Sequence, residues 1–278
     1  MAMALIRSKR LHSVAEEAVK AAGHVARTKF RQPLQISDKG FRDYVTDADI
    51  AAQETITSVI RTAFPDHGFI TEEDDSSLPG NGPIIWIVDP IDGTTNYSRR
   101  VPLFCVSLAA VVKKPTLKTA DVLVGAIYDP MRDELFSATA DGQCLLNGRP
   151  IRVSKISDLA LATIGTDWNR TGNARQLTLD TVNSLVHHVD AIPCYNSAAL
   201  ALAWVAMGRI DGYFNFSLMP WDVAAASLLI QKSGGKLSGL AGQPITLEAG
   251  SLSCLASNGR LHDQLLQYMP NDNGLLTK

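Results

Sequence analysis

The chain has 278 residues, 46% of them hydrophobic, and a formal net charge of −2 at pH 7. This length and hydrophobic content support one large domain or two lobes that share an interface. The nearly balanced charge creates no overall field that would attract nucleic acid or an anionic membrane, so we expect neither partner.

Targeting and redox signals are weak. Arg7, Lys9 and Arg10 lie near the N-terminus, but no apolar segment typical of a signal peptide follows them. No run reaches the ~18 apolar residues that a membrane span needs. The cysteines are widely spaced and form no C-x-x-C pair, which favours reduced thiols over a disulfide framework. We expect a soluble, cytoplasmic protein.

Helical periodicity and short apolar runs alternate in the first half. Apolar residues recur with three-and-four spacing over 11–26 and 46–64, where Pro65 ends the second helix. The run 84–88 is apolar and rich in β-branched residues, which predicts a strand buried on both faces. A tight turn is expected at Asn147-Gly148. Further strands, connected in antiparallel fashion, are expected at 103–112, 122–128, 134–138 and 151–153.

The second half mixes helices and strands. Strands are expected near Thr163, at 211–216 and at 253–256. Helices are predicted at 174–187, 197–207, 221–233 and 261–268, with glycines closing two of them. The pattern indicates a mixed α-β fold of layered helices and sheets in one domain over 1–278, with lobes of about 1–155 and 156–278.

Two aspartates follow the buried strand, in the segment W-I-V-D-P-I-D-G-T-T-N at 86–96. The strand carries Asp89 to its carboxyl end, where ligands of α/β proteins tend to bind, and Asp92 follows within one turn. Magnesium prefers oxygen ligands and combines one or two carboxylates with phosphate oxygens. The pair therefore predicts a metal site, although the two side chains could merely cap a turn.

A phosphate-binding element follows at once. Gly93 allows close approach of the backbone to a ligand, and the amides of Gly93, Thr94 and Thr95 are expected to open a short helix. A helix start offers unpaired N–H groups and a positive dipole end. Metal and anion sites are therefore expected side by side.

Other acidic groups occur in three places. Glu72 and Glu73 follow a possible short strand at 68–70, which would aim one of them inward, whereas Asp74 and Asp75 fit a solvated loop. Asp222 opens an apolar helix, either as its N-cap or as part of a site. The remaining acids complement the dipole of the helix that begins near residue 46 and are Asp43, Asp47 and Asp49.

Taken together, these segments resemble the inositol monophosphatase superfamily, whose members are magnesium-dependent, lithium-sensitive phosphatases. The run at 86–96 matches the family's first signature, and W-D-V-A-A-A-S-L-L-I-Q-K-S-G-G at 221–235 matches the second. The glutamate pair and D-x-V-T-x-x-D at 43–49 fall in the family's order. The resemblance implies a layered α-β-α-β-α sandwich, a homodimer, and hydrolysis of an inositol monophosphate-like ester by metal-activated water.

The resemblance also implies roles for individual residues. Two or three magnesium ions would be held by Glu72, Asp89, the Ile91 carbonyl oxygen, Asp92 and Asp222, with Asp49 at a third, weaker position. The catalytic group would comprise Glu72 and Thr94, which orient the attacking water, and Asp49. In this scheme the first lobe is catalytic and the second completes the site. Substrate contacts would come from Glu72, Ile91, Asp92, Gly93, Thr94, Thr95, Ser197, Ala198, Asn215 and Asp222.

The sequence departs from the family in the segments that bind the substrate. The pattern R-x-x-G-[ST]-A-A has Pro193 for the arginine and Asn196 for the glycine. Inositol-cleaving members often carry a glutamate where Asn215 stands. Arg170, close to Trp168, is hypothesised to replace the missing arginine, unless it lies on an exposed loop. Alternative substrates are therefore fructose 1,6-bisphosphate, NADP, a nucleotide phosphate or histidinol phosphate; the alternative of another class is a catalytically silent dimeric scaffold.

Overall fold

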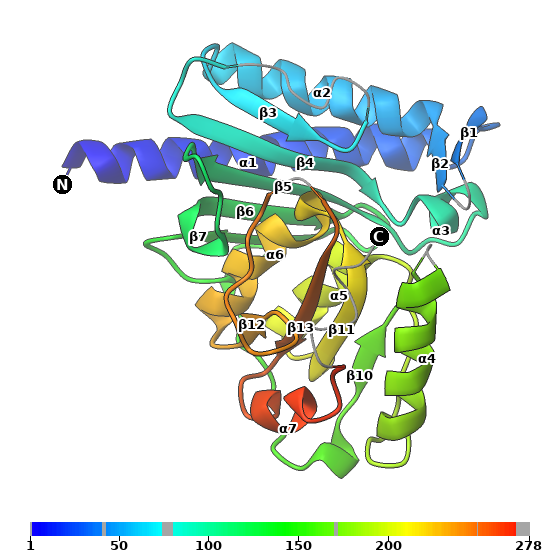
Figure 1. Ribbon diagram of the computed structural model, residues 1–278. Coiled ribbons are helices and arrows are strands. Elements are labelled where there is room, and N and C mark those ends of the chain that lie inside the picture. The colour runs from blue at the N-terminus through cyan, green and yellow to red at the C-terminus, as the bar shows by residue number, and fades with distance from the viewer. Residues whose placement is uncertain (1, 41–42, 74–79, 170–171, 249, 271–278) are drawn as a thin grey trace.

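The first layer of the fold consists of two long helices. A computed structural model describes residues 2–40, 43–73, 80–169, 172–248 and 250–270. Helices α1 (Ala2–Lys29) and α2 (Asp47–Ala63) pack against one face of a large sheet (Figure 1). A capping box opens α2, because the Thr46 hydroxyl accepts from the Ala48 N–H and the Asp49 carboxylate accepts from the Thr46 N–H. Both helices bury the apolar stripe that their periodicity predicts.

The large sheet supplies the second layer. Its strands occur in the order β3 (Gly68–Thr71), β4 (Ile84–Asp92), β5 (Cys105–Val112), β6 (Val122–Asp129), β7 (Glu134–Thr139), β8 (Leu145–Leu146) and β9 (Arg149–Pro150). β3 runs parallel to β4, and every later neighbour is antiparallel, as the short connections predict. Asn147 and Gly148 both have positive φ and form the predicted two-residue turn.

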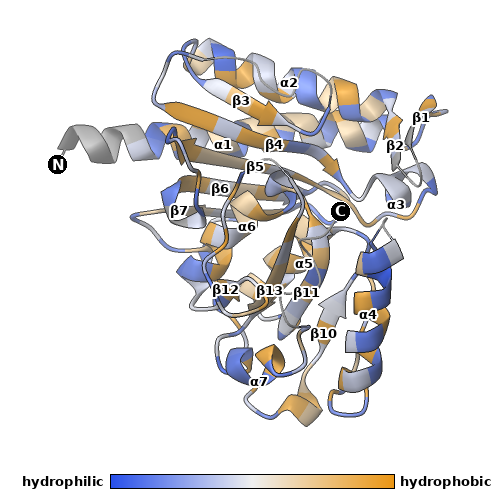
Figure 2. Cartoon of the chain, viewed as in Figure 1, coloured by the Kyte–Doolittle hydropathy of each residue, from blue (hydrophilic) through white to orange (hydrophobic). Residues whose placement is uncertain are grey.

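A central layer of helices separates the two main sheets. Helices α5 (Ala198–Ala206) and α6 (Pro220–Ser233) are apolar on nearly all sides because sheets cover them from both directions. Figure 2 shows the hydrophobic colouring of β4 and β5, which lie in the layer next to these helices.

The second sheet and the outer helices complete the molecule. The sheet has the order β10 (Ile164–Thr166), β11 (Gly212–Leu218), β13 (Leu252–Ser257) and β12 (Lys236–Ser238). Phe214 and Phe216 of β11 face α4 (Gly172–Leu185) and α7 (His262–Leu266), whereas Tyr213 packs with the central helices. The predicted α-β-α-β-α sandwich is confirmed; the division into lobes near residue 155 stays a prediction.

Several short elements differ from the sequence-based expectations. The strand expected at 151–153 is wrong: the Ile151 N–H donates to the Cys144 carbonyl and the Val153 N–H to the Ser233 carbonyl, so this segment ties layers together instead of extending the sheet. The hairpin of β1 (Ile36–Gly40) and β2 (Asp43–Thr46) and the strand β12 were not expected, since these runs are short and partly polar.

Two further features concern the helices and the cysteines. Within the described ranges, no helix combines the length and the hydropathy needed to cross a membrane. The four cysteines are free thiols, and Cys194 is exposed whereas Cys105, Cys144 and Cys254 are buried.

Candidate active site

A bulge at the end of β4 brings two aspartates to one side. In a regular strand, residues three apart point to opposite faces. Asp89 pairs with Ser107 of β5, but Asp92 pairs with Cys105, so three steps on β4 match two on β5. The extra residue, which lies in a stretch containing Pro90, allows both carboxylates to point toward the same place.

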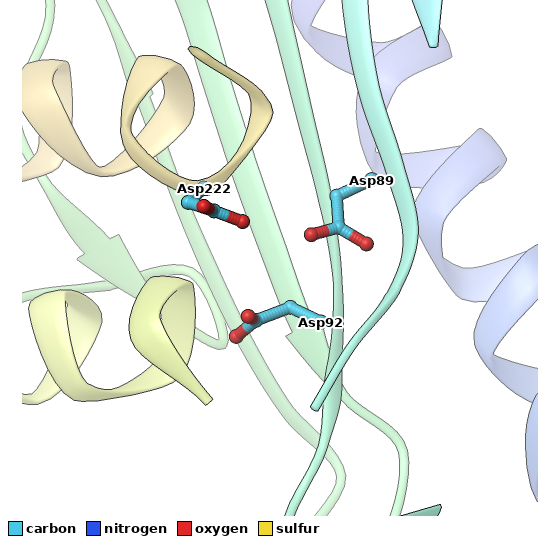
Figure 3. A group of neighbouring side chains, drawn as sticks. All are labelled: Asp89, Asp92 and Asp222. Atoms are coloured by element: carbon cyan, nitrogen blue, oxygen red, sulfur yellow. The ribbon is translucent and has the colours of Figure 1, made fainter. Parts of the chain in front are cut away.

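Asp222 completes a cluster of three carboxylates. Oxygens of Asp89, Asp92 and Asp222 lie within 4.8 Å of one another, and Figure 3 shows the three side chains converging from β4 and the start of α6. Asp222 lies in the first turn of α6, where its Oδ2 accepts the Met219 N–H at 2.7 Å. This side chain therefore helps to cap the helix and also faces the cluster.

Glu72 joins the cluster because β3 and β4 are parallel. The Glu72 N–H donates to the Val88 carbonyl oxygen at 3.2 Å, which places Glu72 beside the end of β4. A side-chain hydrogen bond links the carboxyl groups of Glu72 and Asp89. Glu73 is also buried, and its N–H donates to Gln53 Oε1 of α2. Asp74 and Asp75 lie outside the described residues.

Burial and mutual repulsion raise the pKa of these carboxyl groups. Burial is the largest cause in each case, and it raises the pKa of Glu72 to about 8, with further contributions from the charges of Asp222, Glu73 and Asp49. Burial and the charge of Glu72 raise the pKa of Asp89 well above its ordinary value. The pKa of Asp92 is also raised, although hydrogen bonds from Ser197 and the α5 backbone oppose the shift. Without a cation, the cluster therefore retains protons at neutral pH.

The donor set fits a hard divalent cation. The carboxylate oxygens are of the type that magnesium prefers. Asp89 Oδ1 is buried and accepts no hydrogen bond from the described residues. A buried acceptor of this kind is costly unless a proton or an ion satisfies it. A bound cation would satisfy this oxygen and would offset the repulsion within the cluster.

Asp92 is held by the N-terminus of α5. Its Oδ2 accepts from the Ser197 hydroxyl at 2.5 Å and from the Ala199 N–H at 2.9 Å, and its Oδ1 accepts from the Ala198 N–H at 3.1 Å. The first N–H groups of a helix have no partners inside it and favour an anion. Ser197 and Ala198, predicted as substrate contacts, line the cavity, but the Ser197 hydroxyl and the Ala198 N–H donate to Asp92.

The segment expected to bind phosphate opens a short helix beside the cavity. Gly93 has φ = 99° and precedes the short helix α3 (Thr94–Ser98), so a side chain there would be strained. Thr94 Oγ1 donates to the Ile91 carbonyl oxygen at 3.1 Å, which leaves its lone pairs free to accept. Thr95 is exposed, and Gly93, Thr94 and Thr95 all line the cavity.

The acidic residues at the start of α2 lie behind the cluster. Asp49 is buried, takes part in the capping box, does not line the cavity, and acts on Glu72 through its charge. Asp47 forms an ion pair with Lys29 at 2.5 Å. The position of Asp47 and Asp49 in the first turn of α2 is the one expected from the dipole argument, whereas the ion pair with Lys29 was not expected. The side chain of Asp43 lies outside the described residues.

The carboxylates line one wall of a cavity of about 660 Å³. Asn215 also lines it, and its Nδ2 donates to the Tyr213 hydroxyl while its Oδ1 accepts the Ser217 N–H. Sequence reasoning missed Tyr44, Arg99 and Arg175, which line the same cavity from distant segments that no local pattern connects. Arg170 lies outside the described residues.

Comparisons with known proteins agree with this fold. The sequence profile of the Inositol monophosphatase family matches residues 8–272. The Nus factor SuhB of Escherichia coli is 35% identical over 263 residues, covering 94% of this chain and 96% of that protein. The inositol-1-monophosphatase of Synechocystis is 35% identical over 262 residues, covering 92% and 87%. The solved structure of inositol monophosphatase from Anabaena has a TM-score of 0.80 at 32% identity and covers 95% of this chain and 98% of that one.

The layered fold, the carboxylate-lined cavity and these relatives define a phosphoric monoester hydrolase. The chain belongs to the inositol monophosphatase family.

Proposed function

We propose that this phosphatase hydrolyses the phosphate monoester of a small polyol-like metabolite with the help of magnesium. The observation that carries the proposal is the meeting of Asp89, Asp92 and Asp222 within 4.8 Å, next to Glu72 and the Gly93–Thr95 segment. Buried carboxylates repel one another, and shared divalent cations, which prefer oxygen ligands, would offset this repulsion. The names of the inositol monophosphatase relatives support the substrate class.

The side chains and amides of the site have distinct tasks in the proposed reaction. Glu72, Asp89, Asp92, Asp222 and the Ile91 carbonyl would hold magnesium. Bound there, magnesium supplies positive charge to the phosphate oxygens and lowers the pKa of water. The amides of the first turn of α3 would hold the phosphoryl group, since they lack partners within the helix. Thr94 Oγ1 donates its own hydrogen bond to the Ile91 carbonyl oxygen, so it would accept a hydrogen bond from the attacking water. Glu72 would orient that water from the other side.

Further parts of the proposal rest on the resemblance. Asp49 would serve a third, weaker magnesium position. Its carboxylate is buried and close enough to Glu72 for its charge to raise the pKa of Glu72, which supports this role. Inhibition by lithium, assembly as a homodimer and a cytoplasmic location stay predictions. Asn215 lines the cavity and would donate its second Nδ2 proton to a hydroxyl of the substrate, since the first is donated to the Tyr213 hydroxyl.

A panel of phosphate esters tests the proposal directly. We expect release of inorganic phosphate from inositol monophosphate or a related polyol phosphate in magnesium and none in a chelator. The panel includes fructose 1,6-bisphosphate, NADP, 2′-AMP and histidinol phosphate, which represent the alternative substrate classes. Absence of phosphate release from every ester in magnesium would favour the alternative of a catalytically silent scaffold. Retention of the complete carboxylate cluster argues against that alternative.

A further inference from the structure

The cavity contains two arginines that the proposed hydrolysis does not use. Arg99 follows α3, and Arg175 lies in the first turn of α4. Both line the cavity that also contains the carboxylate cluster. Neither forms an ion pair with a carboxylate of the described residues. Other arginines do: Arg132 pairs with Asp129 and Arg209 pairs with Glu134.

Arg175 is held in place by an aromatic ring. Its guanidinium carbon lies 5.7 Å from the centre of the Trp168 ring, and its Nη1 donates to the Asn169 carbonyl oxygen at 3.2 Å. A guanidinium presents five N–H donors in a rigid plane, so most of its donors are still available. This cation–π contact and one backbone hydrogen bond reduce the entropy that Arg175 would lose on binding a ligand.

The neighbouring groups do not neutralise this charge. Asp167 lines the same cavity, and both its oxygens are engaged, Oδ1 by the Tyr195 and Asn196 N–H groups and Oδ2 by the Tyr213 hydroxyl. Position 215 is an uncharged amide. Trp168, although it lines the cavity, keeps 40% of its surface exposed.

We infer that Arg175, supported by Trp168 and joined by Arg99, forms a subsite for a second anionic group on the leaving alcohol of the substrate. The inference rests on the proposed function and narrows it to phosphate esters that carry another phosphate or a carboxylate. Charge-assisted, bidentate recognition of such a planar or tetrahedral anion is what a fixed guanidinium provides. The role inferred for Arg175 is similar to the one hypothesised from the sequence for Arg170, which lies outside the described residues and stays a prediction.

Matched synthetic esters test the subsite. Straight-chain alkyl phosphates of three and six carbons carry at their far end a hydroxyl, a carboxylate or a second phosphate. We expect kcat/KM in magnesium to favour an anionic end over the hydroxyl by roughly ten- to a hundredfold at one chain length, mainly through KM. The two anions distinguish phosphate from carboxylate recognition.

Two variants assign the preference to Arg175. Arg175→Gln should reduce the preference to about one, whereas Arg175→Lys should retain part of it. Arg61→Gln is the matched control, because Arg61 lies 5.7 Å from the Phe69 ring but outside this cavity, and it should keep the full preference. A preference that survives Arg175→Gln, or no preference at either length, would overturn the inference.

Calorimetric binding separates this inference from the proposed function. In the Asp89→Asn background, where turnover is not expected, the ester with an anionic end should bind roughly tenfold or more tightly than the hydroxyl ester, and Arg175→Gln should remove the difference. If no ester is hydrolysed but this difference is found, the proposed function fails and the anion subsite stands. If the hydroxyl esters are hydrolysed and no difference in binding is found, the subsite fails alone.

Discussion

Asp89 and Asp92 come from the same bulge but have different surroundings. Asp92 accepts hydrogen bonds from Ser197, Ala198 and Ala199, whereas Asp89 Oδ1 accepts none from the described residues. Hydrogen bonds to the ionised form favour it, and burial without them favours the proton. Asp89 is therefore the carboxyl whose state should depend most on a bound cation.

Asp89→Asn should remove activity and leave the fold intact. The amide keeps the shape of the side chain but cannot supply the anionic ligand, so we expect kcat to fall about a thousandfold or more. Phosphate release and far-ultraviolet circular dichroism check the two parts. Asp190→Asn, an exposed acid elsewhere, is the control and should behave as the wild type. Retained activity in Asp89→Asn would remove the metal assignment.

The raised pKa of Glu72 makes the stability of the metal-free protein depend on pH. Its pKa is about 8 in the folded protein and 4.5 in the unfolded chain, so between these pH values the folded protein binds more protons than the unfolded chain. The free energy of unfolding should therefore fall as pH rises from about 4.5 to about 8. Thermal unfolding in a chelator at pH 6, 7 and 8 measures this decrease.

Magnesium should reverse that loss. The cation replaces protons on the cluster, so the gain in melting temperature on adding magnesium should be larger at pH 8 than at pH 6. In Asp89→Asn both the loss and the gain should be smaller. A magnesium effect that is equal at both pH values would contradict the proton–metal exchange.

At the scale of elements, the corner between β4 and α3 is tightly packed. Gly93 has positive φ, and a Cβ added there would lie 3.1 Å from the carbonyl oxygens of Asn196 and Leu103. The Asn96 side chain donates to the Leu103 and Tyr195 carbonyls, at 2.8 and 2.7 Å. Residues 93–96 and 195–197 therefore fit together as one unit.

Gly93→Ala should be more damaging than a comparable glycine replacement. We expect a loss of about 1–3 kcal/mol in the free energy of unfolding, from backbone strain and the two close contacts, together with reduced activity. Gly234→Ala is the control, since Gly234 has φ = 94° but no atom within 4 Å of an added Cβ. Urea denaturation compares them. Equal losses in the two variants would show that φ alone, and not the packing at the corner, determines the cost.

The backbone at residue 196 explains one departure from the family pattern. Asn196 has φ = 53°, the left-handed conformation that asparagine adopts more readily than most residues. Its N–H donates to Asp167 Oδ1, which fixes this conformation from a separate strand end. The asparagine can therefore serve where the family pattern has glycine.

Periodicity predicted the large elements of the whole molecule, because each of them buries a continuous apolar face. It missed β1, β2 and β12, whose short runs gain their stability from neighbours far along the chain. The sequence placed Asp89 and Asp92 together, but the local pattern could not choose between Glu72 and Glu73, and only the family resemblance pointed to Glu72. That choice depends on the register of β3 against β4.

Contacts across about a hundred residues were beyond local patterns. Hydrogen bonds from residues 197–199 at the start of α5 reach Asp92. The cavity is lined by Tyr44, Arg99 and Arg175, which are also far apart in the sequence. Nothing in the local sequence of either partner specifies the other. The layered topology, in which α5 and α6 begin beside the end of β4, creates these contacts (Figure 1).

Because the cluster draws on β4 and α6 while α5 holds Asp92, magnesium should tighten all three elements together. A ligand that binds only the assembled site lowers the population of locally opened states. We expect magnesium to slow hydrogen exchange at the Met219 N–H, which donates to Asp222, and at the Ala198 and Ala199 N–H groups, which donate to Asp92. The amides of α4 beyond its first turn serve as an internal reference and should change little. Protection that remains confined to the 86–95 segment would mean that α5 and α6 are not coupled to the ion, and the shared site would then have to be abandoned.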